Sequence, residues 1–408
     1  MPCILKQPTS ESPGIITFTH GEALWGLPKR SKRVKNFLLE AKRSGKWIFG
    51  IHIQGDCSYL EKWPMPEWQS FVMWPNQQAK FLHNLPSDQF CKYTCVNFLP
   101  KFLAIKPVEF KEWDICVISR ASSIKRIEET LLLLRALLDR RPETKIVCIV
   151  PDSRHLHLGN KSYAKQSIDK SYFELPRNLF SARELKNISF ISSSQDAFGN
   201  FPLADSLVAD ILIKSKFMML TSHSEGVPRV IAETLLLGTP CIVSENLSSG
   251  LNESLNKENS LKIVDDPLGA ALQLNLALEN YEKFSVNRHQ AMSLFSEAEH
   301  LNAFKKFLSD KLIAMGSKDQ GNWYLEDLHL RLACHGQKQQ SQFFYNEKIF
   351  FKWLERASAL QGTYADEDFL TNLDGLKDSP NARQKLRSYL GTIRRWLKNN
   401  LKALYAKY

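Results

Sequence analysis

Residues 224–244 read Ser-Glu-Gly-Val-Pro-Arg-Val-Ile-Ala-Glu-Thr-Leu-Leu-Leu-Gly-Thr-Pro-Cys-Ile-Val-Ser, and this stretch decides the predicted fold. Strand-like residues precede it at 217–221, and 241–243 again favour a strand. A strand, a turn with Gly and Pro, an apolar helix and a second strand are typical of a parallel β/α unit. The helix start near Val227 offers free backbone N–H groups, so it predicts a seat for a phosphate or for hydroxyl groups.

Two glutamates of this stretch are candidates for binding a ligand. Glu225 falls in the turn, and Glu233 falls inside the apolar helical run. Burial of Glu233 among apolar neighbours would be costly without a partner. The alternative is structural: a glutamate at a helix entry and a solvated glutamate on the helix. We expect Arg229 to form a local ion pair.

The alternation of strands and helices continues on both sides of this unit. It is regular over 113–298 and weaker over 1–112. Such alternation predicts an α/β protein whose parallel sheets are covered on both faces. We expect two Rossmann-like domains, 1–112 and 113–298, with their sheets facing one cleft. A helix at 299–312 is expected to return toward the first domain, and 313–408 is expected to form a helical extension.

A second cluster of polar residues lies where an earlier strand passes to its helix. Arg120 follows the strand at 114–119, and Lys125 lies near the start of the next helix. Two cations at such a position suit a diphosphate, because they neutralise its charge and donate hydrogen bonds. In the alternative interpretation Arg120 caps a neighbouring carbonyl and Lys125 faces solvent.

The two clusters together resemble a known family. Arg-x4-Lys at 120–125, followed by Ser-x-x-Glu-Gly-x-Pro-x3-Ala-Glu-x4-Gly-x-Pro at 222–240, resembles the family 4 glycosyltransferases (glycosyl transferases group 1) of the GT-B fold. The resemblance is strong across 113–312, weak across 1–112 and absent beyond.

The resemblance implies transfer of a sugar from a nucleoside-diphosphate sugar to an acceptor hydroxyl, with retention, in polysaccharide or glycolipid synthesis. By this resemblance Arg120 and Lys125 would hold the donor's diphosphate, and Glu233 would bind the ribose hydroxyls. The catalytic candidates are Glu225, Arg120 and Lys125. The donor sugar would be held by Glu225 and by the backbone of Gly226, Val227 and Pro228.

Two alternatives within the same fold stay open: a sugar-nucleotide epimerase and a non-catalytic protein that binds sugar nucleotides or glycans. The family's Gly-Gly loop after the first strand is here only His20-Gly21. His20 and Gly21 are therefore further candidates, against the alternative of a histidine satisfied by turn backbone.

No metal or other cofactor is expected, since Arg and Lys can carry the diphosphate. The sequence shows no convincing Asp-x-Asp metal site at a strand end. Asp265 and Asp266 precede Pro267 and are expected to cap a helix.

The net charge of +11 suggests anionic partners. From Asn381 to Tyr408 there are eight Lys or Arg and no acid, and leucines recur at helical spacing. This tail either docks on an anionic membrane surface or packs its leucines on the enzyme body. Nucleic acid is not expected, since no base-reading or stacking motif accompanies the tail.

The beginning of the chain lacks the long apolar core of a signal peptide, and no run approaches the ~20 apolar residues of a membrane span. These features predict a cytoplasmic protein, peripheral on the cytoplasmic membrane face if the tail docks there. Cys91 and Cys95 are expected to be buried thiols.

Overall fold

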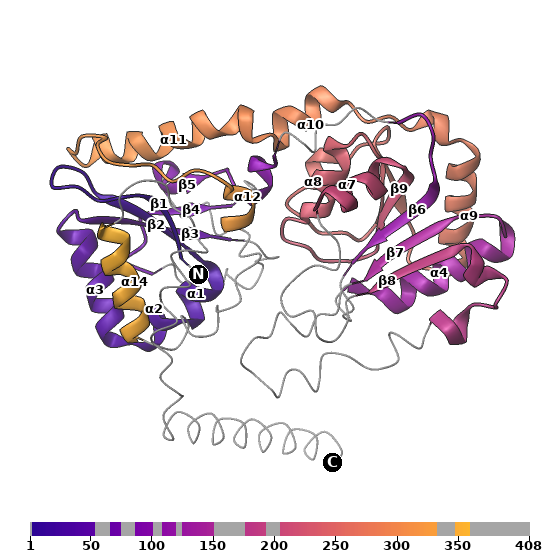
Figure 1. Ribbon diagram of the computed structural model, residues 1–408, viewed down its shortest axis with the longest axis horizontal. Helices are drawn as coiled ribbons and strands as arrows, with labels where there is room; N and C mark the ends of the chain where they lie inside the picture. Colours follow the sequence, from indigo (N-terminus) through magenta and orange to yellow (C-terminus); the bar gives the residue numbers. More distant parts are fainter. Residues whose placement is uncertain are drawn as a thin grey trace, which may run out of the picture.

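The computed structural model describes residues 2–53, 66–74, 86–100, 108–119, 125–150, 176–192, 205–332 and 347–359. These residues form two α/β domains, each built on one sheet, with helices α10 and α11 running along one side of both (Figure 1). The predicted α/β class, with two domains of mainly parallel sheet, is confirmed. The predicted turn that contains Arg120 lies outside the described residues.

The N-terminal sheet has five strands in the order β1-β2-β3-β4-β5. β1 is antiparallel to β2, and the other neighbours are parallel. The N-terminal β1 was not expected from the sequence. The strands are β1 (Cys3–Lys6), β2 (Gly14–Thr19), β3 (Trp47–His52), β4 (Phe71–Met73) and β5 (Phe90–Cys91).

Three helices connect β2 to β3. Helix α3 begins where the Ser31 hydroxyl accepts a hydrogen bond from the Val34 N–H, and it buries an apolar face against the sheet. The helices of this part are α1 (His20–Trp25), α2 (Leu27–Arg30) and α3 (Lys32–Arg43), with 3-10 turns η3 (Ser87–Gln89) and η4 (Cys95–Phe98).

The C-terminal sheet has six strands in the order β11-β10-β9-β6-β7-β8, and all neighbouring pairs are parallel. From β6 the chain moves outward through β7 to β8, and from β9 it moves outward the other way to β11. The order therefore reverses between β6 and β9. The strands are β6 (Trp113–Ile118), β7 (Ile146–Val150), β8 (Ile188–Ser192), β9 (Ser215–Leu220), β10 (Cys241–Ser244) and β11 (Ser260–Ile263).

Helices cover both faces of this sheet. Alternate residues of β6 show it: Ile115 and Val117 share a core with α4 and α9, whereas Cys116 and Ile118 share one with α7 and α8. The helices are α4 (Ile127–Arg140), α7 (Asp205–Ile213), α8 (Arg229–Leu236), α9 (Pro267–Glu279) and α10 (Arg288–Phe295), with 3-10 turns η8 (Glu184–Lys186), η9 (Asn252–Ser254) and η10 (Tyr281–Lys283).

Helix α11 (Glu297–Ala314) packs back on the N-terminal domain. The Phe307 ring meets the Phe71 ring of β4 edge to face, with 6.0 Å between centroids. Phe304 and Leu308 are buried in the same cluster as Met73. One apolar cluster thus joins the two domains through α10 and α11.

The chain after α11 also packs on the N-terminal domain. The Tyr324 N–H donates to the Leu5 carbonyl at 2.9 Å, and the Gln7 N–H donates to the Asn322 carbonyl at 3.0 Å, so this segment pairs with β1. Helix α12 (Leu328–Arg331) follows, and α14 (Glu347–Ala359) lies beside α3.

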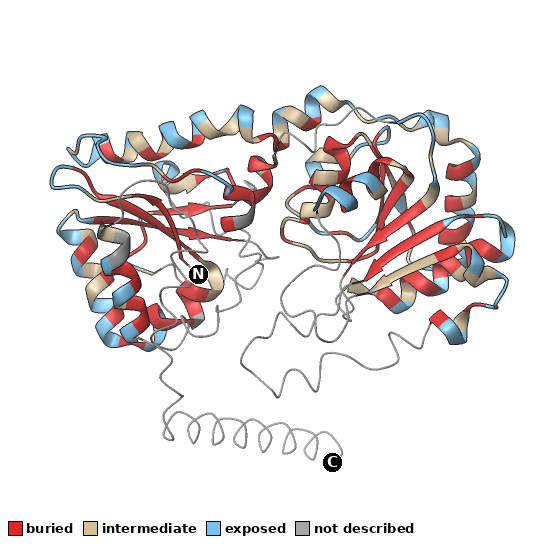
Figure 2. Cartoon of the chain, viewed as in Figure 1, coloured by how far each residue is buried: buried red, intermediate tan, exposed pale blue. Residues whose placement is uncertain are grey.

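The inner side of α14 belongs to the N-terminal core (Figure 2). Phe350 and Trp353 are buried in one cluster with Phe18, Phe49 and Trp68. Burying each such side chain contributes roughly 1.5–3 kcal/mol, so α14 is part of what stabilises this short domain. None of the helices in the described ranges combines the length and apolar character needed to cross a bilayer. Residues 381–408 lie outside those ranges, so both interpretations of the tail stay predictions.

Candidate functional site

The candidate site lies at the carboxyl end of the C-terminal sheet, where the strand order reverses between β6 and β9. In open parallel sheets the loops after the two strands at such a reversal diverge and leave a crevice for ligands. The first loop leads to Lys125 at the start of α4, and the second contains Glu225.

Lys125 and Glu225 form an ion pair at this reversal. Their side chains are only 13% and 11% exposed. The Glu225 loop is held in place because the Glu225 N–H donates to the Ser248 carbonyl at 2.9 Å and the Gly250 N–H donates to the Gly226 carbonyl at 2.8 Å. Lys125 therefore does not face solvent. Arg120 lies outside the described residues.

The segment Gly226–Pro228 leads into α8, with Pro228 as its N-cap and Val227 half-buried. Inside α8, Glu233 accepts a hydrogen bond from Arg229 one turn earlier, and Arg229 also contacts Asp205 of α7 at 3.3 Å. The expected local ion pair of Arg229 is confirmed. Burial raises the pKa of Glu233, and the nearby Arg229 cation offsets part of that rise.

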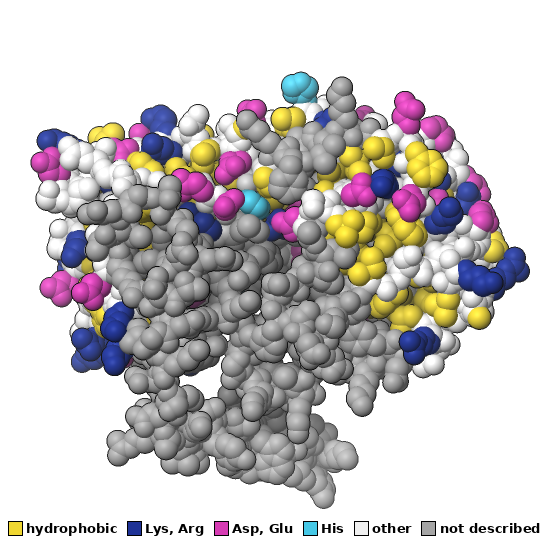
Figure 3. Space-filling view, viewed as in Figure 1, with side chains coloured by type: hydrophobic (Ala, Val, Ile, Leu, Met, Phe, Trp, Pro, Cys, Tyr) yellow, Lys and Arg dark blue, Asp and Glu magenta, His cyan; other side chains and the backbone are white. Residues whose placement is uncertain are grey.

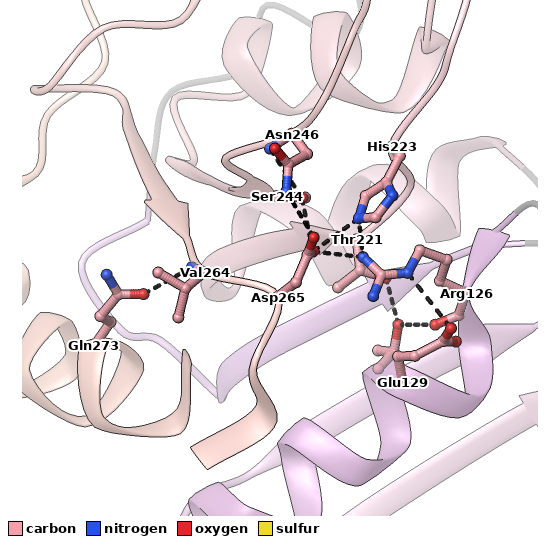
Figure 4. Close-up of polar contacts among 10 residues, drawn as sticks. Arg126, Glu129, Thr221, His223, Ser244, Asn246, Val264, Asp265 and Gln273 are labelled. Carbon is pink, nitrogen blue, oxygen red and sulfur yellow. Dashed lines mark hydrogen bonds and ion pairs between the residues drawn. The ribbon is translucent and has the colours of Figure 1, made fainter. Parts of the chain in front are cut away.

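A second charged group surrounds Asp265, two residues after the end of β11 (Figure 4). Its Oδ1 accepts from Arg126 at 2.6 Å, from His223 Nε2 at 2.8 Å and from the Ser244 hydroxyl at 3.2 Å. Its Oδ2 accepts from the Asn246 amide at 2.6 Å. The four partners come from the start of α4, the loop after β9 and the end of β10, so Asp265 ties together the loops at this edge of the sheet.

The pKa of Asp265 shows the strength of this arrangement. Burial alone would raise it, but the hydrogen bonds from His223, Arg126 and Asn246 outweigh burial and hold the pKa well below its usual range. Asp265 is thus a permanent anion at neutral pH.

Arg126 has an unusual backbone. Its φ of 50° places it in the left-handed region, which costs energy for a residue with a Cβ atom. It is the N-cap residue of α4, next to Lys125, and its side chain is held by Asp265 and by Glu129 at 3.5 Å. Such backbone geometry concentrates at functional sites.

Two buried hydroxyls lie at the same edge. Ser119 follows β6 and Ser222 lies just after β9, and neither hydroxyl has a hydrogen-bond partner among the residues that the structure describes. Beside them Thr130 and Thr221 share a hydrogen bond of 2.5 Å. Buried polar atoms without a partner are rare, which again marks the strand reversal as a place for a ligand.

Sequence reasoning missed part of this site. Asp266 caps α9, as expected, because its carboxylate accepts from the Gly269 N–H at 2.6 Å. The same expectation was wrong for Asp265, which faces Arg126 and His223 instead. The signal available was its position directly after a strand, at the edge where ligands bind.

His20 and Gly21 lie at the carboxyl end of the N-terminal sheet, in the first turn of α1. Burial lowers the pKa of His20 to about 4, although Glu22 opposes the shift. Burial also lowers the pKa of the neighbouring His52 to about 3, and the proximity of His20 adds to the effect. Both imidazoles are therefore neutral at physiological pH.

Cys91 and Cys95 are buried and free, which confirms the expectation of buried thiols. Among the described residues no group of three or more His, Cys, Asp or Glu could hold a metal ion, and whether the protein uses a metal stays a prediction.

No family model matches this chain, and no curated protein matches it in sequence. Several solved structures are similar in shape. HepE of Anabaena, in complex with UDP and glucose, is 15% identical with a TM-score of 0.48, over 68% of this chain and 76% of that one. The UDP-forming α,α-trehalose-phosphate synthase of Burkholderia vietnamiensis is 11% identical with a TM-score of 0.49, over 70% and 72%.

TarM is 12% identical with a TM-score of 0.43, and the match covers 64% of this chain and 50% of TarM. The chain therefore spans about half the length of that protein.

Proposed function

We propose that this protein is a glycosyltransferase that moves a sugar from a nucleoside-diphosphate sugar to an acceptor hydroxyl. The observation that carries the proposal is the Lys125–Glu225 pair at the strand reversal of the C-terminal sheet. A cation and a carboxylate at one strand reversal suit the two ends of such a donor. The cation suits the diphosphate, and the carboxylate suits the hydroxyls of the sugar.

Donor binding would exchange partners within this pair. The diphosphate competes with Glu225 for Lys125, and the sugar hydroxyls then give Glu225 new hydrogen-bond donors. Lys125 stays beside the leaving diphosphate and stabilises the charge that develops when the sugar–phosphate bond breaks. By the sequence resemblance Arg120 would add a second cation and Glu233 would bind the ribose, after release from Arg229.

Retention of configuration is a finer part of the proposal. In the donor complex the sugar hydroxyls would occupy Glu225, and Asp265 accepts four hydrogen bonds. Neither carboxylate is placed as a covalent nucleophile of the kind that retaining hydrolases use. Attack of the acceptor hydroxyl on the face of the leaving group, with the donor phosphate as base, suits these residues. The acceptor class, a polysaccharide or glycolipid, rests on the resemblance alone.

The test has two stages. A thermal-shift panel of nucleoside diphosphates and their sugars should identify a ligand that raises the melting temperature. With that donor radiolabelled in the sugar, transfer to an acceptor supports the proposal, an altered sugar nucleotide supports an epimerase, and binding without any product supports a binding protein.

Lys125→Ala should then abolish turnover, with Lys145→Ala, an exposed cation of the same domain, as the matched control. Unchanged turnover in the Lys125 variant would overturn the diphosphate assignment.

A further inference from the structure

Helices α2 and α3 carry a dense set of positive charges. Residues 29–46 contain eight Lys or Arg and a single acid, Glu40. The eight are Lys29, Arg30, Lys32, Arg33, Lys35, Lys42, Arg43 and Lys46. Figure 3 shows several Lys and Arg side chains at the lower left of the molecule, with Asp or Glu side chains among them, where Figure 1 places α2 and α3.

The geometry of α3 places several of these charges away from its buried side. Val34, Leu38 and Ala41 form the buried side. At 100° per residue Lys32 and Arg43 fall on the opposite side, next to the exposed Glu40, and Lys35 falls on the flank. All three cations are exposed. Lys46 is exposed just beyond the end of the helix. We call the set Lys32, Lys35, Arg43 and Lys46 the cationic face.

No acidic side chain in the described part of the chain pairs with the cationic face. In the described ranges none of its four members forms an ion pair, whereas cations on other helices do. Examples are Arg135 with Asp139 on α4, Lys214 with Asp210 after α7, and Lys306 with Asp310 on α11. A row of like charges disfavours a helix, so an external anionic partner would relieve a local cost.

Helix α14 adds to this side of the domain. Phe351 lies between α14 and α3, 4.8 Å below the Arg33 guanidinium and 5.4 Å from the Phe37 ring. The exposed Lys352 is its neighbour. The chain leaves α14 at Ala359, and the tail sequence of 381–408, with eight cations and no acid, follows 21 residues later.

We propose that the cationic face docks on the surface of an anionic lipid bilayer. Each Lys or Arg near such a surface gains attraction that falls off within a Debye length, so several cations on one side of a domain act together. The half-buried Leu39 lies within the row, where it can meet the headgroup region.

A nucleic acid fits this face less well. Proteins that bind single strands usually offer aromatic rings on which bases stack. The one exposed aromatic ring among the large hydrophobic residues of the described ranges is Phe110, in the segment before β6 and not on α2, α3 or α14.

The test compares two variants of the full chain that each lose four exposed cations. One replaces the cationic face: Lys32→Gln, Lys35→Gln, Arg43→Gln and Lys46→Gln. The matched control replaces four exposed cations of the C-terminal domain: Lys145→Gln, Lys186→Gln, Lys257→Gln and Lys262→Gln. Co-sedimentation is measured with vesicles of phosphatidylcholine and phosphatidylglycerol at low salt, and with phosphatidylcholine alone.

The wild type and the control should bind the anionic vesicles, and the face variant should bind about a hundredfold less, with its tail intact. Equal binding by the face variant and the wild type would overturn the proposal. A second variant replaces the eight tail cations with glutamine and keeps the cationic face intact. Complete loss of vesicle binding by this variant would also overturn the proposal. Binding of a polyuridine RNA through the cationic face, without vesicle binding by the wild type, would assign the face to nucleic acid instead.

Discussion

Lys125 and Glu225 are 100 positions apart in the sequence, and their side chains form an ion pair where β6 and β9 end side by side. Their charges attract more strongly there than at an open surface, because both side chains are largely withdrawn from water. An anion that binds Lys125 must therefore displace Glu225, and the released carboxylate must find a donor. A sugar nucleotide supplies both in one molecule.

This exchange of partners predicts that Glu225→Gln affects the binding of a nucleoside diphosphate and the transfer of the sugar differently. Affinity for a bare nucleoside diphosphate should rise or stay equal, because Lys125 loses its competing carboxylate. The kcat/KM for transfer should fall by about a hundredfold, because the carboxylate that holds the sugar is gone. Calorimetric titration and steady-state kinetics measure the two effects. Glu128→Gln, an exposed glutamate in the first turn of α4, is the control. If the affinity for the nucleoside diphosphate fell together with kcat/KM, the proposed exchange of partners between Lys125 and Glu225 would be contradicted.

Arg126 gives a prediction about the backbone. Arg126→Gly and Arg126→Ala remove the same cation, but glycine adopts a φ of 50° without a steric cost and alanine does not. The alanine variant should be less stable than the glycine variant by about 1 kcal/mol, although alanine normally ranks above glycine. Urea unfolding of both proteins measures the difference. The ordinary ranking, with alanine more stable, would show that the left-handed backbone is not retained.

Asp265 makes part of the stability depend on pH. In the unfolded chain an aspartate titrates near about 3.9, whereas the native pKa is held well below that value. The unfolded state therefore binds more protons in this range, and stability falls as the pH falls. The contribution is fully present at neutral pH and is lost once the pH drops below about 4 toward the native pKa.

Asp265→Asn should remove this contribution. Because the Asp265 side chain is 34% exposed, the loss at neutral pH should be only about 1 kcal/mol. The difference in unfolding free energy between wild type and variant should shrink on acidification. A difference that stays constant down to the acid transition would contradict the prediction.

The sequence predicted those parts of the molecule that depend on local pattern. Strand and helix periodicity placed the elements around Glu225, and the resemblance to family 4 glycosyltransferases implied that Lys125 and Glu225 belong to one site. Asp265 was assigned to a helix cap because Asp-Asp-Pro is a common local signal for one. Its contact with Arg126 depends on the strand order β11-β10-β9-β6, which brings together residues 139 positions apart.

The C-terminal extension also makes contacts that local sequence pattern does not predict. Aromatic and apolar residues at 349–354 are compatible with a helix, but their partners lie near the other end of the chain. The pairing of Tyr324 with Leu5 and of Trp353 with the core around Phe18 and Trp68 follows from the path of α11 back to the first sheet. No local pattern in either segment encodes that path.

The role of α14 gives the last prediction. Trp353 is fully buried in the core of the N-terminal domain, so Trp353→Ala should lower the free energy of unfolding by about 3–5 kcal/mol. Phe110→Ala, at a ring that is 74% exposed, should change it by less than about 0.5 kcal/mol. Denaturant unfolding measures both values, and limited proteolysis should show earlier cleavage within residues 2–53 in the Trp353 variant. If the two variants unfolded alike, α14 would be an appendage and not a structural part of the domain that it covers.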